Sequence, residues 1–436
     1  AQLEQQLYLL LPVLQPRVVE VDQVAKALSS DGVLVEFQRY RPFDGKKPPK
    51  QRWGTARYLA LILKPSGSSA AVDLGEAAAI DTAVAAAISA SAQSQSDADQ
   101  LLAGVSTLVL TPLQPHLASS RQWFLSPDGE LNRVPFAALP SPGAPGMTVG
   151  SSVNLRMLIT GRDLLRFQEP AARGQAPLVM ANPSFDRQGA QVASVPVQVK
   201  EQLGNQQRSA VIDAKVWTSL PGTVVEGQQI GALLRSQPLT GSEATVLRLQ
   251  RSQGPRVVHV ATHGFFAPDQ ERKPTDPLAA VMERSQQLAG FAGEDPMLRS
   301  GLVLAGANQP GADPSDDGYL TAAEATALQL EGTELVVLSA CSTGQGDIRT
   351  GEGVYGLQRA LTVAGARTTL LSLWKVDDKA TAAFMEAFYK RLKGGAGRAD
   401  ALAATQAEFR NHPNTAWRQP YYWAAWQLVG DWRPIE

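Results

Sequence analysis

One cysteine and one histidine each follow a predicted buried strand, and together they could perform nucleophilic catalysis. Cys341, the only cysteine among 436 residues, follows the apolar run 334–340 and precedes the small-residue stretch 342–346. His263 follows the apolar run 255–262 and precedes Gly264, where a turn is expected. Such runs are typical of buried parallel strands, and α/β sheets bind ligands at the carboxyl ends of their strands. The sequence therefore predicts that the thiol and the imidazole lie at adjacent strand ends.

These residue types fit acyl transfer. A cysteine nucleophile needs a base that raises its thiolate fraction, and histidine is the usual partner. The glycine after His263 allows the backbone to approach a substrate, so the N–H of Gly264 could hold a developing oxyanion. The N–H of Cys341 could be the second donor. From the residues alone, two interpretations stay open: a catalytic pair, or a buried cysteine that acts as a small core hydrophobe.

The stretches around both residues resemble the CHAT family of caspase-like cysteine proteases, which are often fused to tetratricopeptide repeats and are related to separase and the caspases. The resemblance includes His259–Gly264 around the histidine and Leu338–Gly344 around the cysteine. Further matching stretches follow in the family's order between residues 120 and 430: 127–131, 135–139, 220–223, 300–306, 317–322, 352–357, 364–366, 372–378 and 420–425. The resemblance implies a cysteine endopeptidase that cleaves proteins through a Cys341–His263 dyad, without metal or cofactor.

The same resemblance points to a residue that binds substrate. Residues 373–378 are similar to the separase segment L-W-D-V-T-D, whose last aspartate lines the pocket for a basic P1 side chain. By this resemblance Asp378 would select Arg or Lys through charge and paired hydrogen bonds, with Asp377 and then Glu352 as alternatives. An aspartate at this place is also an excellent N-cap for the helix expected over 379–393.

Two neighbours of the proposed dyad are given smaller roles. His259 shares a strand face with His263 but lies ~13 Å from it, so the two cannot act on one atom. We interpret His259 as a buried or supporting histidine. Ser339, two residues before Cys341, adds no charge to a pocket.

Composition excludes several classes of partner. The chain has 40 Lys and Arg against 41 Asp and Glu, which leaves no electrostatic footprint for nucleic acid or an anionic membrane. No apolar stretch reaches the ~20 residues of a transmembrane helix, and the N-terminus lacks a signal-peptide pattern. A single cysteine fits a reducing, cytoplasmic compartment and argues against a Cys/His zinc site. The start at Ala1 rather than Met suggests an absent upstream region, which the resemblance identifies as tetratricopeptide repeats.

Alternating strand and helix patterns after residue 121 predict an α/β fold, a mostly parallel sheet with helices on both faces. The resemblance makes it caspase-like. Residues 1–120 form a smaller α+β N-terminal half with antiparallel strands over 32–39 and 57–64. We expect two units, a regulatory, pseudo-protease-like region (1–120) without catalytic groups and a CHAT protease domain (121–436). The expected strands after 121 are 123–126, 153–159, 178–182, 210–216, 257–261, 301–305, 335–339, 368–373 and 425–430. The expected helices are 76–95, 225–236, 242–250, 321–327, 353–364, 379–393 and 400–411.

The long polar stretch 268–299 directly after His263 could be a lid over the crevice or a disordered insertion. Two other functions stay open: a catalytically silent caspase-like scaffold for protein–protein signalling, and a different thiol enzyme such as an acyltransferase.

Overall fold

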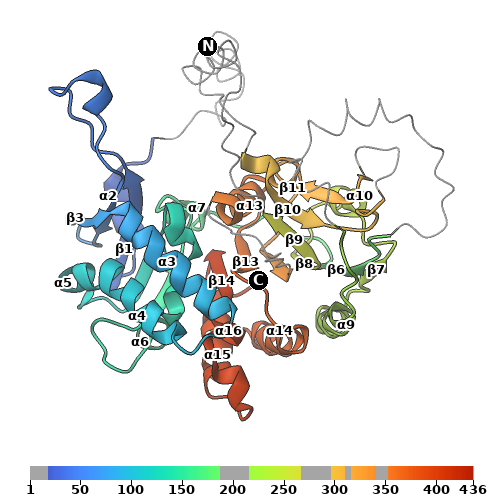
Figure 1. Cartoon of the computed structure of the whole chain (residues 1–436). Coiled ribbons are helices and arrows are strands. Elements are labelled where there is room, and N and C mark those ends of the chain that lie inside the picture. Colours follow the sequence, from blue (N-terminus) through green and yellow to red (C-terminus); the bar gives the residue numbers. More distant parts are fainter. Residues whose placement is uncertain (1–17, 187–215, 267–295, 310–315, 340–351, 436) are drawn as a thin grey trace, which may run out of the picture.

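The computed structural model describes residues 18–186, 216–266, 296–309, 316–339 and 352–435. In these residues the dominant element is an 11-stranded sheet, ordered β3-β2-β1-β4-β5-β14-β13-β12-β8-β6-β7 (Figure 1). Its strands are β1 (Gly32–Tyr40), β2 (Arg57–Leu63), β3 (Ser69–Glu76), β4 (Gln122–Ser126), β5 (Asn154–Met157), β6 (Leu178–Pro183), β7 (Leu239–Gly241), β8 (Val257–Ala261), β12 (Leu335–Ser339), β13 (Thr368–Ser372) and β14 (Trp426–Gly430). A second, three-stranded antiparallel sheet contains β9 (His263–Phe266), β10 (Ser300–Val303) and β11 (Tyr319–Thr321).

Neighbouring strands of the large sheet run parallel except in the pairs β1/β2, β2/β3 and β13/β14. The mostly parallel sheet predicted from the sequence is therefore confirmed. In parallel sheets both faces are covered, and central strands are apolar along their whole length. β8 fits this description, since all its residues are buried.

Helices cover both faces of this sheet. The main helices are α2 (Val21–Ala27), α3 (Ala77–Ala92), α4 (Ala98–Val109), α7 (Asp163–Arg166), α9 (Gly222–Leu234), α10 (Val246–Gln250), α12 (Ala322–Ala325), α13 (Glu352–Val363), α14 (Asp378–Lys393), α15 (Arg398–Arg410) and α16 (Pro420–Trp423). Two short ones, α5 (Gln114–Leu117) and α6 (Val149–Ser152), lie in connections. Val337 of β12 packs in the apolar cluster that includes α3, α4, α14 and α15. Its neighbours Val336 and Leu338 pack in the cluster that includes α10, α12 and α13. The α/β class with two covered faces is thus confirmed.

The N-terminal half is the α+β unit that the sequence predicts. β1 and β2 pair antiparallel from Leu34↔Leu63 to Tyr40↔Arg57, and α3 follows as the alanine-rich helix. β4, which lies after the predicted boundary at residue 120, pairs parallel with β1, so one sheet continues through both predicted units. The division at 120/121 stays a prediction.

The two parts of the sheet meet at a short junction. β5 and β14 are neighbours, but their register contains the single pair Val429↔Met157. A cavity lies beside this junction, and Trp426 and Arg156 contribute to its lining. The Arg156 guanidinium bridges from β5 to Asp400 of α15, with Nη2 2.7 Å from Oδ1. The N-terminal and C-terminal strands are therefore joined mainly by side chains and covering helices.

Several predictions fall on residues outside the described ranges. These are Cys341, the strand over 210–215, the first residues 1–17 and residues 268–295 of the proposed lid. Among the described residues, no helix combines the length and apolar character that crossing a membrane requires.

Candidate active site

The carboxyl ends of β8 and β12 position the site. Ala261 and Ser339, the last residues of these parallel strands, are register partners. The Thr262 N–H also donates to the Ser339 carbonyl at 3.3 Å. His263 therefore lies two residues after Ala261 in the sequence, and Cys341 lies two residues after Ser339, the register partner of Ala261. Cys341 itself lies outside the described residues.

The chain after His263 differs from the sequence prediction. A turn was expected there, but His263 is the first residue of β9 and pairs with Val303 of β10. Gly264 pairs with Leu302 in the same ladder. The side chain of Thr262 donates its hydroxyl to the Val303 carbonyl, which fixes the step from one sheet to the other. The imidazole is therefore held by the start of a strand rather than by a turn.

The His263 ring is oriented by a backbone carbonyl. Its Nε2 lies 2.8 Å from the carbonyl oxygen of Thr218. Because a carbonyl can only accept, Nε2 must carry the proton, which assigns the lone pair of the neutral ring to Nδ1. The half-buried ring also contacts Phe185 and Trp217, each with a centroid distance of 5.2 Å. This arrangement presents Nδ1 as the nitrogen able to act as a base.

The wall behind the imidazole is itself fixed by hydrogen bonds. The indole N–H of Trp217 donates to the Tyr319 hydroxyl at 2.9 Å. The Trp217 backbone N–H donates to Oδ1 of Asn308 at 2.8 Å. These contacts hold the segment that supplies the Thr218 carbonyl. Sequence reasoning did not find this carbonyl, because any residue type can provide one.

A pocket lined mostly by polar residues opens beside His263. It lies where α9, the ends of β8, β12 and β13, and the start of α14 converge. The pocket brings His263 together with Asp378, the residue predicted to bind substrate. The residues that line it are Leu220, Thr223, Glu226, Thr262, His263, Ser339, Ser372, Lys375, Val376, Asp378, Thr381 and Trp426.

The two adjacent aspartates have different positions. Asp377 is the N-cap of α14, and its Oδ1 accepts a hydrogen bond from the Ala380 N–H at 3.0 Å. Asp378 is the first residue of the helix, and it lines the pocket. Capping therefore belongs to Asp377, which leaves the Asp378 carboxylate available to the pocket.

Burial and neighbouring charges shift the pKa of the Asp378 carboxyl group. Burial raises the pKa of the Asp378 carboxyl above its ordinary value. The neighbouring negative charges of Asp377 and Glu226 raise this pKa further, whereas Lys375 and His263 lower it. The carboxylate is thus partly dehydrated and lies within electrostatic range of the imidazole.

A glycine makes room for this carboxylate. A Cβ atom added at Gly222, the first residue of α9, would lie 2.4 Å from Cβ and 2.6 Å from Oδ2 of Asp378. Real Cβ atoms essentially never approach so closely. The N-terminus of α9 can therefore pack on Asp378 only because residue 222 has no side chain.

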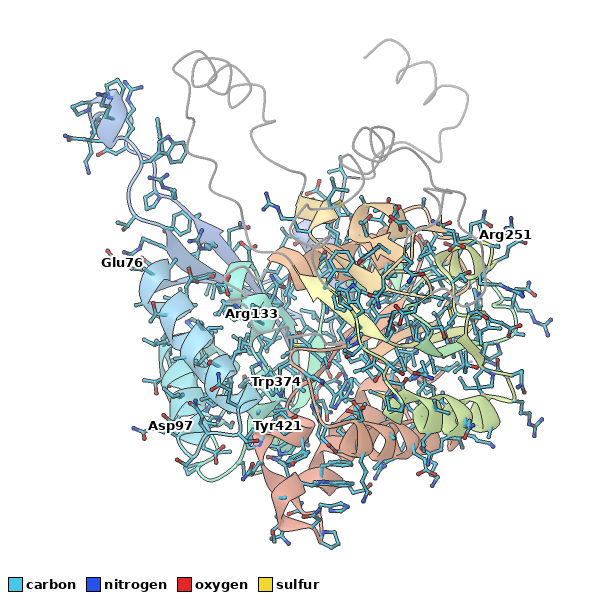
Figure 2. The ribbon with its side chains drawn as sticks, turned by 45° about the vertical axis from the view of Figure 1, so that its right-hand side comes forward. Glu76, Asp97, Arg133, Arg251, Trp374 and Tyr421 are labelled. Carbon is cyan, nitrogen blue, oxygen red and sulfur yellow. The ribbon has the colours of Figure 1, made fainter. Side chains whose placement is uncertain are left out.

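A buried tryptophan anchors the segment that carries these residues. Trp374 follows β13 and has no exposed surface. Its indole N–H donates to the Tyr421 carbonyl at 3.0 Å, and Figure 2 shows the two residues close together. Buried Trp374 and its hydrogen bond to Tyr421 thereby fix the connection from β13 to α14, which carries Lys375 and leads to Asp378.

The structure also adds residues that the sequence did not indicate. Glu226 of α9 is buried and lines the pocket with Asp378, and the exposed Lys375 lies at the same pocket. Glu352 begins α13, but its side chain lies outside the described part of the chain. The part of the chain that the structure describes contains no group of three or more His, Cys, Asp or Glu that could hold a metal ion.

The site is thus an oriented imidazole at a strand end beside a pocket lined by two carboxylates, those of Asp378 and Glu226. The CHAT domain model matches residues 99–431, and the chain belongs to the CHAT domain family. The chain is 27% identical over 344 residues to Tetratricopeptide repeat protein 28 of Homo sapiens, a match that covers 74% of this chain and 13% of that protein. The Mus musculus protein of the same name is 29% identical over 234 residues, which covers 51% of this chain and 9% of that protein.

Two solved structures share a more distant similarity. The Saccharomyces cerevisiae separase–securin complex aligns with 94% of this chain and 31% of that chain, at 10% identity and a TM-score of 0.46. The Arg-specific cysteine proteinase gingipain R aligns with 75% of this chain and 68% of that chain, at 8% identity and a TM-score of 0.35. At these values neither structure supports an argument about mechanism or substrate.

Proposed function

We propose that this chain is a cysteine endopeptidase with Cys341 as nucleophile and His263 as acid and base. The supporting observation is the register pair Ala261↔Ser339. His263 follows the first member of this pair by two residues, and Cys341 follows the second by two residues. Parallel neighbours lie about 4.8 Å apart, so the strands deliver the two segments to one edge of the sheet. Membership of the CHAT family supports the same assignment.

The proposed reaction uses few groups. The Cys341 thiolate bonds to the scissile carbonyl carbon, and the N–H groups of Gly264 and Cys341 hold the oxyanion. The C–N bond then breaks, and the His263 imidazolium gives its Nδ1 proton to the leaving amine. Water, deprotonated by His263, hydrolyses the thioester and frees Cys341. Throughout, the Thr218 carbonyl accepts from Nε2 and stabilises the charged ring.

The test is a peptide-library cleavage profile of the chain beside Cys341→Ala and His263→Ala. Each substitution should lower kcat/KM by about four orders of magnitude or more, and the double variant should be little worse than either single one. Circular dichroism checks that the variants fold. A single variant with near wild-type turnover would refute the dyad.

Other outcomes of the library experiment distinguish the remaining functions. A chain that folds but cleaves no peptide would favour the protein-binding scaffold. The name of the tetratricopeptide repeat relatives also suggests this function. A product that depends on an acyl donor would favour the acyltransferase.

We further propose that cleavage follows a basic P1 residue bound by Asp378. The position of Asp378 in the pocket beside His263 supports this specificity. Asp378→Asn should lower kcat/KM for Arg substrates by orders of magnitude, since losing one partner of a buried charge pair costs about 2–5 kcal/mol. The matched control is Asp377→Asn, which perturbs the helix cap and should leave the Arg preference unchanged. Met, Leu or Asp preferred at P1 would contradict the proposal.

The partners and location are also proposals. We propose that the full-length protein carries tetratricopeptide repeats, supported by the printed name of its relatives, of which this chain spans 13% or less. Such repeats bind proteins on concave surfaces and could control the protease. A cytoplasmic location agrees with the single cysteine.

A further inference from the structure

Behind the pocket lies a buried chain of three polar side chains from three elements. His259, in the middle of β8, has no exposed surface. Its Nδ1 lies 3.2 Å from the Tyr389 hydroxyl of α14, and its Nε2 lies 3.3 Å from Oε1 of Glu226 in α9. Glu226 and Tyr389 are only 1% and 2% exposed. The histidine that the dyad does not use thus joins the two helices that frame the pocket.

The protons of this chain can be assigned. Burial, together with the negative charge of Glu226, raises the pKa of Tyr389 well above its ordinary value, so the phenol keeps its proton. Its hydrogen bond with His259 Nδ1 can run in either direction, but a ring proton on Nδ1 would turn the Nε2 lone pair toward Oε1 of Glu226, 3.3 Å away, so we assign the phenol as the donor. The ring proton then resides on Nε2 and faces the Glu226 carboxylate. Tyr389 and His259 thereby place a ring N–H group 3.3 Å from Oε1 of Glu226.

The carboxylate of Glu226 still has hydrogen-bonding capacity. The approach of Nε2 to Oε1 is within ion-pair distance but is not aligned as a hydrogen bond, and neither atom has another hydrogen-bond partner among the described residues. Buried polar groups usually find partners, and an ionised carboxylate demands them most. Oε1 faces His259 and is closed to solvent, so a ligand with N–H donors in the pocket would bind this carboxylate through Oε2.

Glu226 also lines the pocket, and it is more completely buried than Asp378, the residue predicted from the sequence. Asp378 is half-buried, Lys375 at the same pocket is exposed, and Glu226 is buried. The charge of Glu226 acts on the Asp378 carboxyl, so the two carboxylates lie near each other. A cationic side chain that enters from the Lys375 side would meet two carboxylates at two depths.

We propose that Glu226, positioned by His259 and Tyr389, is a second substrate-binding carboxylate that makes the pocket select arginine over lysine. This inference rests on the proposed basic specificity. Arginine presents five N–H donors in a planar fork and can engage two carboxylates, whereas the lysine ammonium is a compact point charge that Asp378 alone can pair. Asp378 then provides the preference for a positive charge, and Glu226 provides the preference for a guanidinium.

The test separates pocket binding from catalysis. Titration calorimetry of the full chain with agmatine, a guanidinium probe, and cadaverine, an ammonium probe, measures the pocket without turnover. Wild type should bind agmatine about tenfold or more tightly than cadaverine, and Glu226→Gln should remove that preference while changing cadaverine affinity less than about threefold. Asp378→Asn should weaken both probes. Tyr389→Phe, which keeps the carboxylate but removes its support, should lower the agmatine preference partially.

Cleavage of matched peptides with Arg or Lys at P1 provides the second measurement. Glu226→Gln should lower kcat/KM for the Arg peptide mainly through KM, and alkylation of Cys341 by iodoacetamide should be unchanged. Equal binding of both probes by wild type, or an Arg preference that survives in folded Glu226→Gln, would overturn the inference. Wild-type chain that binds agmatine selectively but cleaves nothing would instead refute the endopeptidase and leave the role of Glu226 standing.

Discussion

Substitution of Gly222 by alanine tests whether the close contact between α9 and α14 shapes the pocket. The added Cβ would lie 2.4 Å from the Asp378 Cβ, an atom that rotation of the aspartate cannot move away. The two helices must therefore separate until this distance approaches the 3.4 Å of ordinary van der Waals contact. Overpacking of this kind costs about 1–3 kcal/mol. The better helix propensity of alanine returns at most about 1 kcal/mol.

The expected result of Gly222→Ala is a net loss of up to about 2 kcal/mol in the free energy of unfolding, the difference between these two effects. Urea denaturation followed by circular dichroism measures it. Because the same separation displaces Asp378, kcat/KM for an Arg substrate should fall about tenfold, the change that 1.4 kcal/mol of lost binding produces.

Gly104→Ala is the matched control. Gly104 lies in α4, where an added Cβ meets no atom within 4 Å. The same substitution should there stabilise the chain by about 0.5–1 kcal/mol and leave cleavage unchanged. A Gly222→Ala chain as stable as Gly104→Ala, with full activity on the Arg substrate, would show that the packing of α9 on Asp378 does not constrain the pocket.

Two other predictions concern charged groups. Because the pKa of Asp378 is raised by burial, its charge is lost at a higher pH than that of an ordinary aspartate, so KM for Arg substrates should rise on acidification through that raised pKa. Asp378→Asn should flatten this limb of the pH profile, and a profile that the substitution leaves unchanged would assign the limb to another group. Arg398→Met should lower stability by about 1–3 kcal/mol in urea denaturation, because it removes the buried guanidinium whose Nη2 lies 2.6 Å from Glu334 and whose Nη1 lies 3.5 Å from Asp431. Each carboxylate keeps a further arginine partner, Arg256 for Glu334 and both Arg367 and Arg433 for Asp431. A loss below about 1 kcal/mol would show that water or repacking compensates the two carboxylates.

The sequence predicts the strands and helices that are buried on one face or on both faces. β8 and β12 appear as uninterrupted apolar runs because both faces of each strand are covered. α14 is predicted within one residue of its start because an aspartate cap precedes it. β3 was not predicted, although half-buried Ala70, Val72 and Leu74 alternate with exposed residues, because this edge strand buries none of its residues completely. β9 and β11 are too short to give a periodic signal.

The residues of the candidate site also fall into those that the sequence predicts and those that only the structure reveals. His263 and Asp378 could be found because each stands in a motif that resembles a known family. Glu226 could not, because α9 exposes its neighbour Val225 at 51% and buries the glutamate, the reverse of what hydrophobicity predicts. The Thr218 carbonyl is likewise invisible in a sequence, since every residue has one. The stretch Leu220–Thr223 was a usable signal, for it matched the family and leads directly into α9.

The single register pair between β5 and β14 has a mechanical consequence for the pocket. The β5/β14 ladder has one register pair, whereas the β4/β5 and β13/β14 ladders on either side of it have four and five, so fewer backbone pairs oppose rotation at this joint. Trp426 lines the cavity at the joint and also the pocket that contains His263. A displacement of the N-terminal strands relative to the C-terminal ones would therefore also move a wall of the pocket beside the proposed catalytic base.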